Sequence, residues 1–421
     1  MIPFPPMYED DFKASARFLD SDDIGMNRPS FKAALSVEAI NGDISCFLAV
    51  LLGDVKVWGS DHFMKFWADG ACVIELTQDG DLQVQDRNGH VGWSSGTSGL
   101  GVKSLELQKR SGNLILIDTK NRTRWQSFDY PTDNLLWSQQ LNASTRLTTP
   151  VTSSPAFFYS LEIRSSKLTL CLNFEDQKYS YWEFKPQRKA NISFIRLGSR
   201  GLKLFNRNST KIGQILETDG KAVRFLALEK TGNLKLYHAR KSYTNLIVFE
   251  SSYQAIDNFC NLPLPCGFSR VCTRNINSTC LDLPETQKYS GFCDRSFKMV
   301  ELEGVDTVLR KPSQMNNLTK DECSSSCTED CSCAAALYAK QKCYHYGLIA
   351  GAREVGRGSE SSFWVKVEKG RHGISTSLMN KILLIGEVAN VLAICCIVGG
   401  ILYWVLKIRQ KRRGNSGTDS N

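Results

Sequence analysis

Apolar and polar residues alternate with a period of two through residues 31–141, and no long helical pattern interrupts them. Leu82 and Val84, for example, alternate with polar neighbours directly after an Asp-Gly pair at 79–80. This alternation predicts strands with one buried face, and Asp-Gly supplies the positive-φ turn that a hairpin favours. We therefore predict a mostly β fold for this region.

One turn-plus-strand phrase recurs three times along the chain. Each copy has a glycine, then Asp or Asn, then leucine, and a strand-like run follows: Asp79-Gly80-Asp81-Leu82, Ser111-Gly112-Asn113-Leu114 and Thr231-Gly232-Asn233-Leu234. Recurrence of one unit predicts a prism that is built of sheets and has internal quasi-symmetry.

A different pattern fills residues 382–406, an apolar run of 25 residues in which Glu387 is the one charge. Such a run is long enough to cross a hydrocarbon core of about 30 Å as a helix. Five basic residues follow within seven positions, and this bias places the tail in the cytosol. The sequence thus predicts a single-pass type I protein of the plasma membrane with its N-terminal region outside the cell.

Glycosylation sequons and cysteines agree with an extracellular, oxidising environment. Six N-x-S/T sequons precede the predicted span and none follows it, at Asn121, Asn142, Asn191, Asn208, Asn277 and Asn317. Ten of the 15 cysteines lie between Cys260 and Cys343. A framework this dense persists only outside the reducing cytosol.

The first thirty residues conflict with this topology, because they lack the basic start and apolar run of a signal peptide. Two explanations stay open. The start of the reading frame is incomplete, or the span inserts as a tail anchor with the bulk of the chain in the cytosol. The sequons, the cysteines and the basic flank favour the first.

Charge and motifs argue against nucleic-acid binding and against catalysis. The formal net charge of +9 is spread along the chain, without the concentrated basic patch that phosphates require. Gly92-Trp93-Ser94-Ser95-Gly96 fits a nucleophile-elbow pattern, but that elbow needs a helix after the serine, and strand-like runs surround this one. We therefore predict a protein without enzyme activity, cofactor or metal.

Several stretches resemble the ectodomain of the plant S-domain (G-type lectin) receptor-like kinases. The bulb-type, mannose-binding-like lectin domain of that family is similar to LTQDGDLQVQDRNGHVGWSSGTSG, SLELQKRSGNLILID and TRWQSFDYPTDNLLWSQQL. The third copy of the phrase, FLALEKTGNLKLYH, resembles the S-locus-glycoprotein-type region. The cysteines of residues 260–280 resemble its EGF-like unit, and residues 322–338 its PAN/apple module.

The resemblance implies a mostly β protein with β-prism lectin domains, a small disulfide-rich EGF-like unit, an α+β PAN/apple module and one transmembrane helix. The predicted regions are an N-terminal segment without signal peptide (1–30), a bulb-type lectin domain (31–145), a second lectin-like region (146–255), the EGF-like unit (256–285), the PAN/apple module (290–370), the span (382–406) and a basic cytoplasmic tail (407–421).

The family's mannose site uses five side chains at alternate positions of one strand, which all point the same way. The candidate carbohydrate-binding residues carried over to this chain are Asp79, Asp81, Asn113, Asn233 and Tyr237. No copy of the phrase keeps more than two of the five residue types. Because an unpaired polar group costs about 1–3 kcal/mol, we expect these residues to serve as turn-forming scaffold rather than as a mannose site.

The same resemblance implies four of the disulfide pairs. It implies the bridges Cys260–Cys272, Cys266–Cys280, Cys323–Cys343 and Cys327–Cys333. Cys46 and Cys72 flank apolar stretches that suit neighbouring strands, and Cys293 with Cys331 would complete the set. Cys171 is then left over, because 13 cysteines precede the span. The alternative is that the cysteines around Cys323–Cys343 bind zinc with His345 as a further ligand, although the spacing of these cysteines fits no two-knuckle zinc pattern.

These features predict a receptor-like glycoprotein whose lectin-like and PAN modules bind an extracellular protein or glycan, with a co-receptor or a second copy as a further partner. The resemblance implies roles such as pollen recognition and defence perception. Two alternatives stay open: the ectodomain fragment of a receptor-like serine/threonine kinase, and a working mannose-binding lectin.

Overall fold

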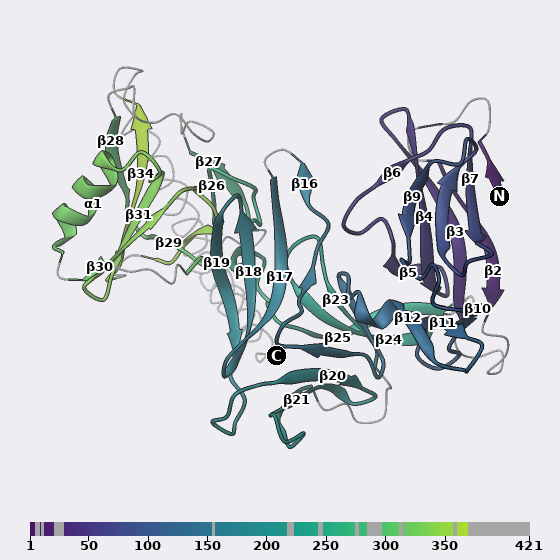
Figure 1. Ribbon diagram of the computed structural model, residues 1–421. Helices are drawn as coiled ribbons and strands as arrows, with labels where there is room; N and C mark the ends of the chain where they lie inside the picture. Colours follow the sequence, from purple (N-terminus) through teal and green to yellow (C-terminus); the bar gives the residue numbers. More distant parts are fainter. Residues whose placement is uncertain are drawn as a thin grey trace, which may run out of the picture.

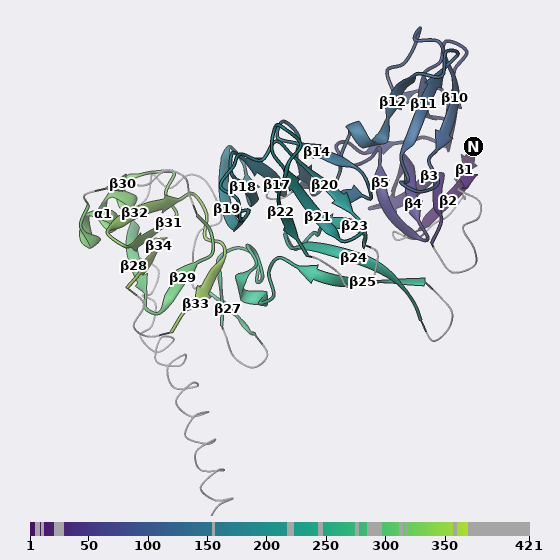
Figure 2. The ribbon, with the colours of Figure 1, turned by 90° about the horizontal axis from the view of Figure 1, so that it is seen from below.

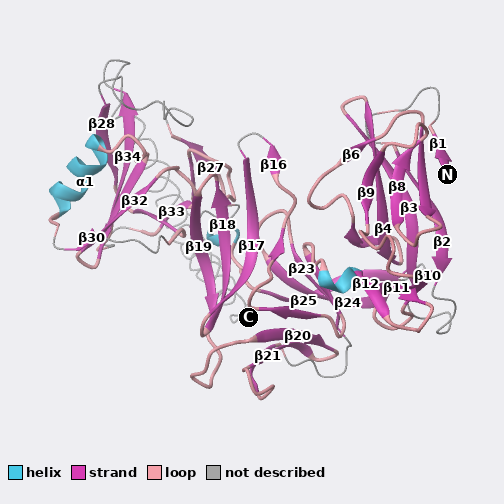
Figure 3. Ribbon diagram, viewed as in Figure 1, coloured by secondary structure: helices cyan, strands magenta, loops and turns pink. Residues whose placement is uncertain are grey.

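A computed structural model describes residues 1–4, 9, 12–20, 29–153, 156–216, 223–242, 247–273, 278–283, 297–310, 315–316, 318–356 and 360–368. The predicted span 382–406 and the tail 407–421 lie outside these residues. Within them, no helix is both long and apolar enough to cross a membrane. The mostly β prediction is confirmed: strands form nearly all of the described secondary structure (Figure 3). The described residues contain one α-helix, α1 (Lys320–Glu329), and two short 3-10 helices, η1 (Ser127–Asp129) and η2 (Phe259–Asn261).

The described chain forms three regions in a row, two sheet-built prisms and a C-terminal module that carries α1 (Figures 1 and 2). Three antiparallel sheets make the first prism. Their strand orders are β2 (Lys13–Asp20), β3 (Phe31–Ile40), β4 (Asp43–Leu52), β5 (Val55–Gly59), with β6 (Phe66–Trp67) also paired to β4; β1 (Ile2–Pro3), β7 (Ala71–Leu76), β8 (Leu82–Asp86), β9 (Val91–Ser94); and β10 (Val102–Leu107), β11 (Leu114–Asp118), β12 (Thr123–Gln126).

Three tryptophans hold the first prism together, and each comes from the last strand of a different sheet. Trp58, Trp93 and Trp125 meet edge to face, with ring centroids 5.7–6.4 Å apart. Aromatic pairs prefer this geometry, because the positive edge of one ring meets the negative face of another. The quasi-symmetry that the recurring phrase predicts is therefore present in the core.

A serine two residues after each tryptophan repeats the same contact. The hydroxyl oxygens of Ser60, Ser95 and Ser127 each accept a hydrogen bond at 3.0 Å, from the backbone N–H of Leu48, Leu82 and Leu114 respectively. The spacing Trp-x-Ser thus marks all three sheets. The sequence analysis missed this repeat, although comparison of residues 58–60, 93–95 and 125–127 would have found it.

Strands from the first thirty residues extend two of these sheets. β1 pairs with β7, and β2 pairs along most of its length with β3. The predicted N-terminal segment 1–30 therefore contributes to the sheets of the first prism.

The second prism repeats the arrangement with three further antiparallel sheets. Their orders are β13 (Asn134–Leu136), β23 (Val223–Leu228), β24 (Leu234–Lys241), β25 (Ile247–Gln254); β14 (Gln140–Asn142), β20 (Phe194–Gly198), β21 (Gly201–Phe205), β22 (Lys211–Ile215); and β15 (Leu147–Thr148), β17 (Ala156–Arg164), β18 (Lys167–Phe174), β19 (Gln177–Phe184), with β16 (Thr152–Ser153) paired to β17. β13 and β14 precede residue 145, where we placed the end of the first lectin domain, yet both pair with strands of the second prism.

The sheet of β13, β23, β24 and β25 belongs to both prisms. Leu226 and Leu236 pack into the core of the second prism, while Phe225 and Tyr237 pack against the core of the first. Because successive side chains of a strand point to opposite faces, apolar residues at adjacent positions give this sheet two buried faces. The two prisms are consequently joined through a shared sheet.

The C-terminal module packs α1 against a sheet ordered β28 (Phe297–Leu302), β34 (Ser362–Glu368), β31 (Ala335–Ala339), β32 (Lys342–Tyr346), β30 (Met315–Asn316). Thr319 and Glu322 form a capping box that satisfies the first N–H groups of α1. A smaller sheet, ordered β27 (Cys280–Asp282), β26 (Arg270–Cys272), β33 (Ala352–Glu354), β29 (Val305–Thr307), links the cysteine-rich segment before the module to the module itself.

Five disulfides join the described cysteines. They are Cys46–Cys72, Cys260–Cys272, Cys266–Cys280, Cys323–Cys343 and Cys327–Cys333, with Cα–Cα distances of 5.4–5.9 Å. These are five of the pairs named from the sequence. Cys331 is also disulfide-bonded, and Cys293 lies outside the described residues. Cys171 carries a free thiol that is fully buried in β18, and burial raises its pKa to about 12, so it is an inert core residue.

Candidate carbohydrate site

The three copies of the recurring phrase form the same turn. Gly80, Gly112 and Gly232 adopt φ values of +89°, +74° and +82°, which L side chains rarely reach. Space also requires glycine at the second copy, because a Cβ atom at Gly112 would lie 2.4 Å from the ring of Phe31. The strands that follow these turns are β8, β11 and β24, so the three copies lie in three different sheets.

Asp81 of the first copy is buried in a hydrogen-bond network. Its carboxylate accepts bonds from the hydroxyls of Ser94 and Ser95 at 2.6 and 2.8 Å, from Nε2 of Gln83 at 2.9 Å and from the N–H of Thr97 at 3.0 Å. Burial alone would raise the pKa of Asp81, but these donors outweigh it and lower the pKa to about 2. Four donors leave this carboxylate little capacity for a sugar hydroxyl.

The two serines of the nucleophile-like pattern are therefore structural. Ser94 and Ser95 both donate to Asp81, and β-structure surrounds them.

Asp79 is the exposed member of the first copy. The hydroxyls of Ser98 and Thr77 donate to its carboxylate and lower its pKa. It lies on the turn before β8, outside the network of Asp81.

Asn113 and Asn233 are the buried counterparts of Asp81. Nδ2 of Asn113 donates to Gln126 at 2.8 Å, and its Oδ1 accepts from Ser127 and from the N–H of Phe128, each at 3.2 Å. Nδ2 of Asn233 donates to the carbonyl of Ile256 at 2.8 Å, and its Oδ1 accepts the N–H of Ile256 at 3.1 Å. Both side chains bind the neighbouring strand or its end and fasten the turn.

Tyr237 is also engaged within the chain. Its hydroxyl donates to the carboxylate of Glu229, and its ring stacks on Phe225 with centroids 4.9 Å apart. The candidate residues thus make internal contacts at separate turns, and the structure does not bring the three copies together into one site. This arrangement fits the expected role as turn scaffold.

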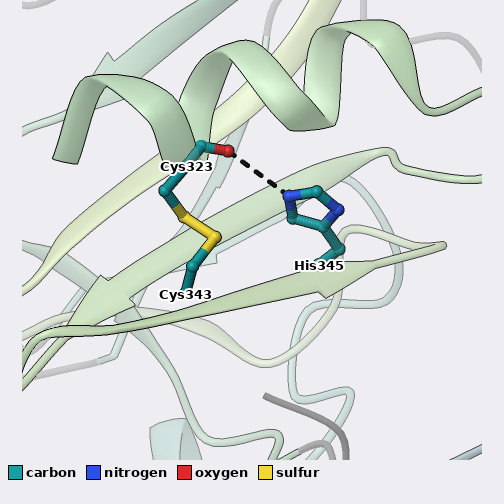
Figure 4. Close-up of side chains that lie close together, drawn as sticks. All are labelled: Cys323, Cys343 and His345. Atoms are coloured by element: carbon teal, nitrogen blue, oxygen red, sulfur yellow. Dashed lines mark hydrogen bonds between the residues drawn. A yellow bond between two sulfur atoms is a disulfide. The ribbon is translucent and has the colours of Figure 1, made fainter. Parts of the chain in front are cut away.

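The cysteine-histidine cluster of the C-terminal module lies between α1 and β32 (Figure 4). Cys323 and Cys343 are bonded to each other, and Nε2 of His345 lies 3.3 Å from the carbonyl oxygen of Cys323 and 3.1 Å from the hydroxyl of Ser326. Cysteine binds zinc as a thiolate, whereas the sulfurs beside His345 are consumed by the disulfides Cys323–Cys343 and Cys327–Cys333. These residues do not fit the zinc alternative.

The described sequons are accessible. Asn121, Asn142, Asn191 and Asn208 are all exposed, as an acceptor of a glycan must be. Asn277 and Asn317 lie outside the described residues.

A cleft of about 620 Å³ between the two prisms was not found from the sequence. Its lining comes from three separate stretches, 62–63, 129–131 and 143–178, and no motif or spacing connects them.

Comparison with known proteins agrees with this architecture. Residues 57–154 match the family described as D-mannose binding lectin. A G-type lectin S-receptor-like serine/threonine-protein kinase of Arabidopsis thaliana is 26% identical, and the alignment covers 86% of this chain and 49% of the relative. A PAN domain-containing protein of Arabidopsis thaliana is also 26% identical, over 63% of this chain and 57% of the relative.

The chain spans about half of the length, or less, of the curated relatives it matches. Among solved structures, a fetuin-binding two-domain lectin from Scilla campanulata is 19% identical and covers 52% of this chain and 95% of its own, with a TM-score of 0.21. The lectin-domain match and the kinase relatives confirm the predicted resemblance to the bulb-type lectin receptor-like family over most of the chain.

Proposed function

We propose that this chain forms the recognition region of a single-pass cell-surface glycoprotein, in which the two prisms and the C-terminal PAN-like module bind an extracellular ligand. Within the described residues, the buried polar side chains fasten turns and the cysteines form bridges, as expected of the scaffold of a recognition region. In this role, binding changes no bond in the ligand.

The observation that supports this proposal most directly is the disulfide framework. Five bridges in the described residues, four of them between Cys260 and Cys343, would not persist in a reducing cytosol. Four exposed sequons agree with the same compartment. The apolar run 382–406 would then hold the chain in the plasma membrane.

Peptide mapping of the protein from its native membrane tests the proposal. We expect the five bridges intact before reduction, and a mass shift after deglycosylation at one or more of Asn121, Asn142, Asn191 and Asn208. Bare asparagines together with free thiols would place the bulk of the chain in the cytosol and overturn the proposal.

A second candidate is the ectodomain of a receptor-like serine/threonine kinase. It is favoured by the kinase relatives and by the 49% of the first relative that the alignment covers. Full-length transcript sequencing past the codon of Asn421 decides it. A continuing frame with a catalytic loop would show that the recognition region belongs to an enzyme.

A working mannose lectin is the third candidate. The candidate residues of the recurring turn-plus-strand phrase make hydrogen bonds within the chain. We therefore expect binding of the protein to a glycan array to be unchanged by Asp79→Ala. Mannose binding that disappears with this substitution would establish a sugar site at the first copy.

A further inference from the structure

The cleft between the prisms combines aromatic walls with a cationic cluster. The first prism contributes Phe63 and Tyr130, and the second contributes Val151, and these side chains are 69%, 49% and 61% exposed. Exposed apolar side chains that converge on one hollow indicate a binding site rather than an ordinary surface.

Tyr130 is held in a fixed position. Its ring stacks on Trp125 with centroids 5.7 Å apart and an angle of 20° between the planes. Its carbonyl oxygen accepts the indole N–H of Trp58 at 2.9 Å. Two of the three core tryptophans therefore orient this aromatic residue at the cleft.

The polar wall is built around Glu162, whose side chain is 13% exposed. Nζ of Lys178 donates to both of its carboxylate oxygens, at 2.8 and 3.1 Å, and the hydroxyl of Ser160 donates at 2.8 Å. The guanidinium of Arg164 lies 3.4 Å away. Lys178 and Arg164 therefore balance the negative charge of Glu162 without Arg146.

Arg146 is the cation that Glu162 holds least tightly. Its Nη1 lies 3.7 Å from Oε1 of Glu162, which is beyond hydrogen-bond distance, and its side chain is 47% exposed. The guanidinium lies over the ring of Phe158, 5.3 Å from the centroid, which holds it in place. Arg146 and Lys178 line this wall together with Glu162, so the wall has an excess of positive charge.

The opposite wall is acidic, and its carboxylates are engaged. Near His62, Asp61 accepts a hydrogen bond from Nζ of Lys56 at 2.8 Å, and Asp133 accepts one from Nδ2 of Asn134 at 2.7 Å. Asp129 lines the first-prism side, and its carboxylate accepts a hydrogen bond from Gln126 at 2.9 Å. His62 donates to or accepts from Thr148 at 3.0 Å across the cleft, and burial lowers its pKa. Positive charge is therefore concentrated on the second-prism side.

We propose that this cleft binds an acidic saccharide. The carboxylate of a uronic acid unit would take the guanidinium of Arg146 in the bidentate geometry that arginine and carboxylate favour. The apolar face of the sugar ring would pack on Tyr130 and Phe63, and its hydroxyls would meet the polar side chains along residues 143–149. The inference rests on the proposed function, since it names the ligand class of the same recognition region.

The test uses the full chain purified from plant membranes, as a reference protein and with further substitutions, and titrates it calorimetrically with trigalacturonic acid. Ser144 lines the cleft and belongs to the sequon of Asn142. All proteins therefore carry Asn142→Gln, so that no attached glycan lies at the rim. Fully methyl-esterified trigalacturonate is the neutral probe, and an oligoglutamate peptide is the acidic probe without sugar rings.

We expect trigalacturonate to bind and its ester to bind at least about tenfold more weakly, because a charge-assisted hydrogen bond is lost. Arg146→Ala should weaken binding of the acid by a similar factor, and Arg146→Gln should do the same while keeping a side chain over Phe158. Tyr130→Ala should weaken both sugar probes. Arg240→Ala is the matched control, since Arg240 is 46% exposed and ion-paired to Glu250 at 2.6 Å; it should leave affinity unchanged.

Three results would overturn the inference. They are no binding of trigalacturonate, equal affinity for acid and ester, and tighter binding of oligoglutamate than of trigalacturonate. Any of these three results, obtained with protein that is glycosylated and has its disulfides intact, would contradict the saccharide proposal and leave the recognition role unaffected. Reduced thiols and bare asparagines would instead contradict the recognition role, whatever the cleft binds.

Discussion

The first prism and the α1 side of the C-terminal sheet bury very different side chains, whereas the other face of that sheet packs into the aliphatic core shared with the second prism. The core of the first prism has one disulfide, Cys46–Cys72, among aliphatic residues and three tryptophans. In the compact cluster beneath α1, four of the six buried residues are cysteines, and Trp364 is the one large ring among the six. A core that is large enough needs few covalent links, whereas a small one depends on them. The two regions should therefore fail for different reasons.

The largest expected effect comes from Trp125→Ala in the first prism. Trp125 is 5% exposed and contacts Trp58, Trp93 and Tyr130. Loss of a buried ring should lower the free energy of unfolding of this prism by about 3–5 kcal/mol. Hydrogen exchange followed by mass spectrometry would report this as faster exchange in β5, β9 and β12.

Trp67→Ala is its control, because Trp67 is 48% exposed. A change below about 0.5 kcal/mol is expected there. Equal effects of the two substitutions would contradict the tryptophan-centred core.

Removal of one disulfide from each region gives the sharpest form of the comparison. The double substitutions Cys323→Ala/Cys343→Ala and Cys46→Ala/Cys72→Ala open bridges of similar sequence separation, 20 and 26 residues. Chain entropy predicts a similar loss for both, about 3 kcal/mol. α1 should lose protection, because the cluster beneath it holds few apolar side chains besides its cysteines, while the first prism stays folded.

Limited proteolysis and hydrogen exchange on the same samples measure the outcome. A first prism that unfolds without Cys46–Cys72, beside a C-terminal module that survives its own loss, would reverse the interpretation.

A smaller effect is expected from Asp81→Asn. The amide has the shape of the carboxylate but offers fewer acceptor sites to Ser94, Ser95 and Thr97, and unsatisfied donors should cost about 1–3 kcal/mol. Asp79→Asn, at the exposed neighbour, should change stability far less.

Asp81 also predicts a pH dependence. Its folded pKa of about 2 lies below the ordinary value of 3.8, so its contribution is fully present above about pH 4 and is lost as the pH falls toward 2. Acid titration of stability, followed by circular dichroism, should show a decline in this window that is smaller in Asp81→Asn. An identical profile in both proteins would show that Asp81 is not the group responsible.

Sequence patterns predicted the features of the fold that are local. Gly80, Gly112 and Gly232 marked their turns because positive φ restricts the residue type, and alternation around Leu82 marked a strand because one face is buried. The pairing of β13 with β23 joins residues such as Leu135 and Leu226, which lie far apart in the sequence, and no local pattern records it. The cleft depends on that pairing, so Arg146 and Tyr130 gave no sequence signal.

The sequence predicted the positions of the candidate site residues but not their contacts, for a related reason. Asp81, Asn113 and Asn233 were identified by position, but position did not say whether their polar atoms face solvent or the neighbouring strand. The Trp-x-Ser repeat, in contrast, is visible in the sequence, because it lies at the strand ends that follow the glycine turns.

The sheet of β13, β23, β24 and β25 has a mechanical consequence. Since its two faces supply both prism cores, the prisms cannot rotate against each other without exposing Phe225 on one side or Leu226 on the other. The hollow at their junction should keep a constant width, with no hinge to close over an incoming molecule. Ligand binding would then act on neighbouring proteins by changing which of them associate with the two prisms, and not by changing the conformation of the prisms.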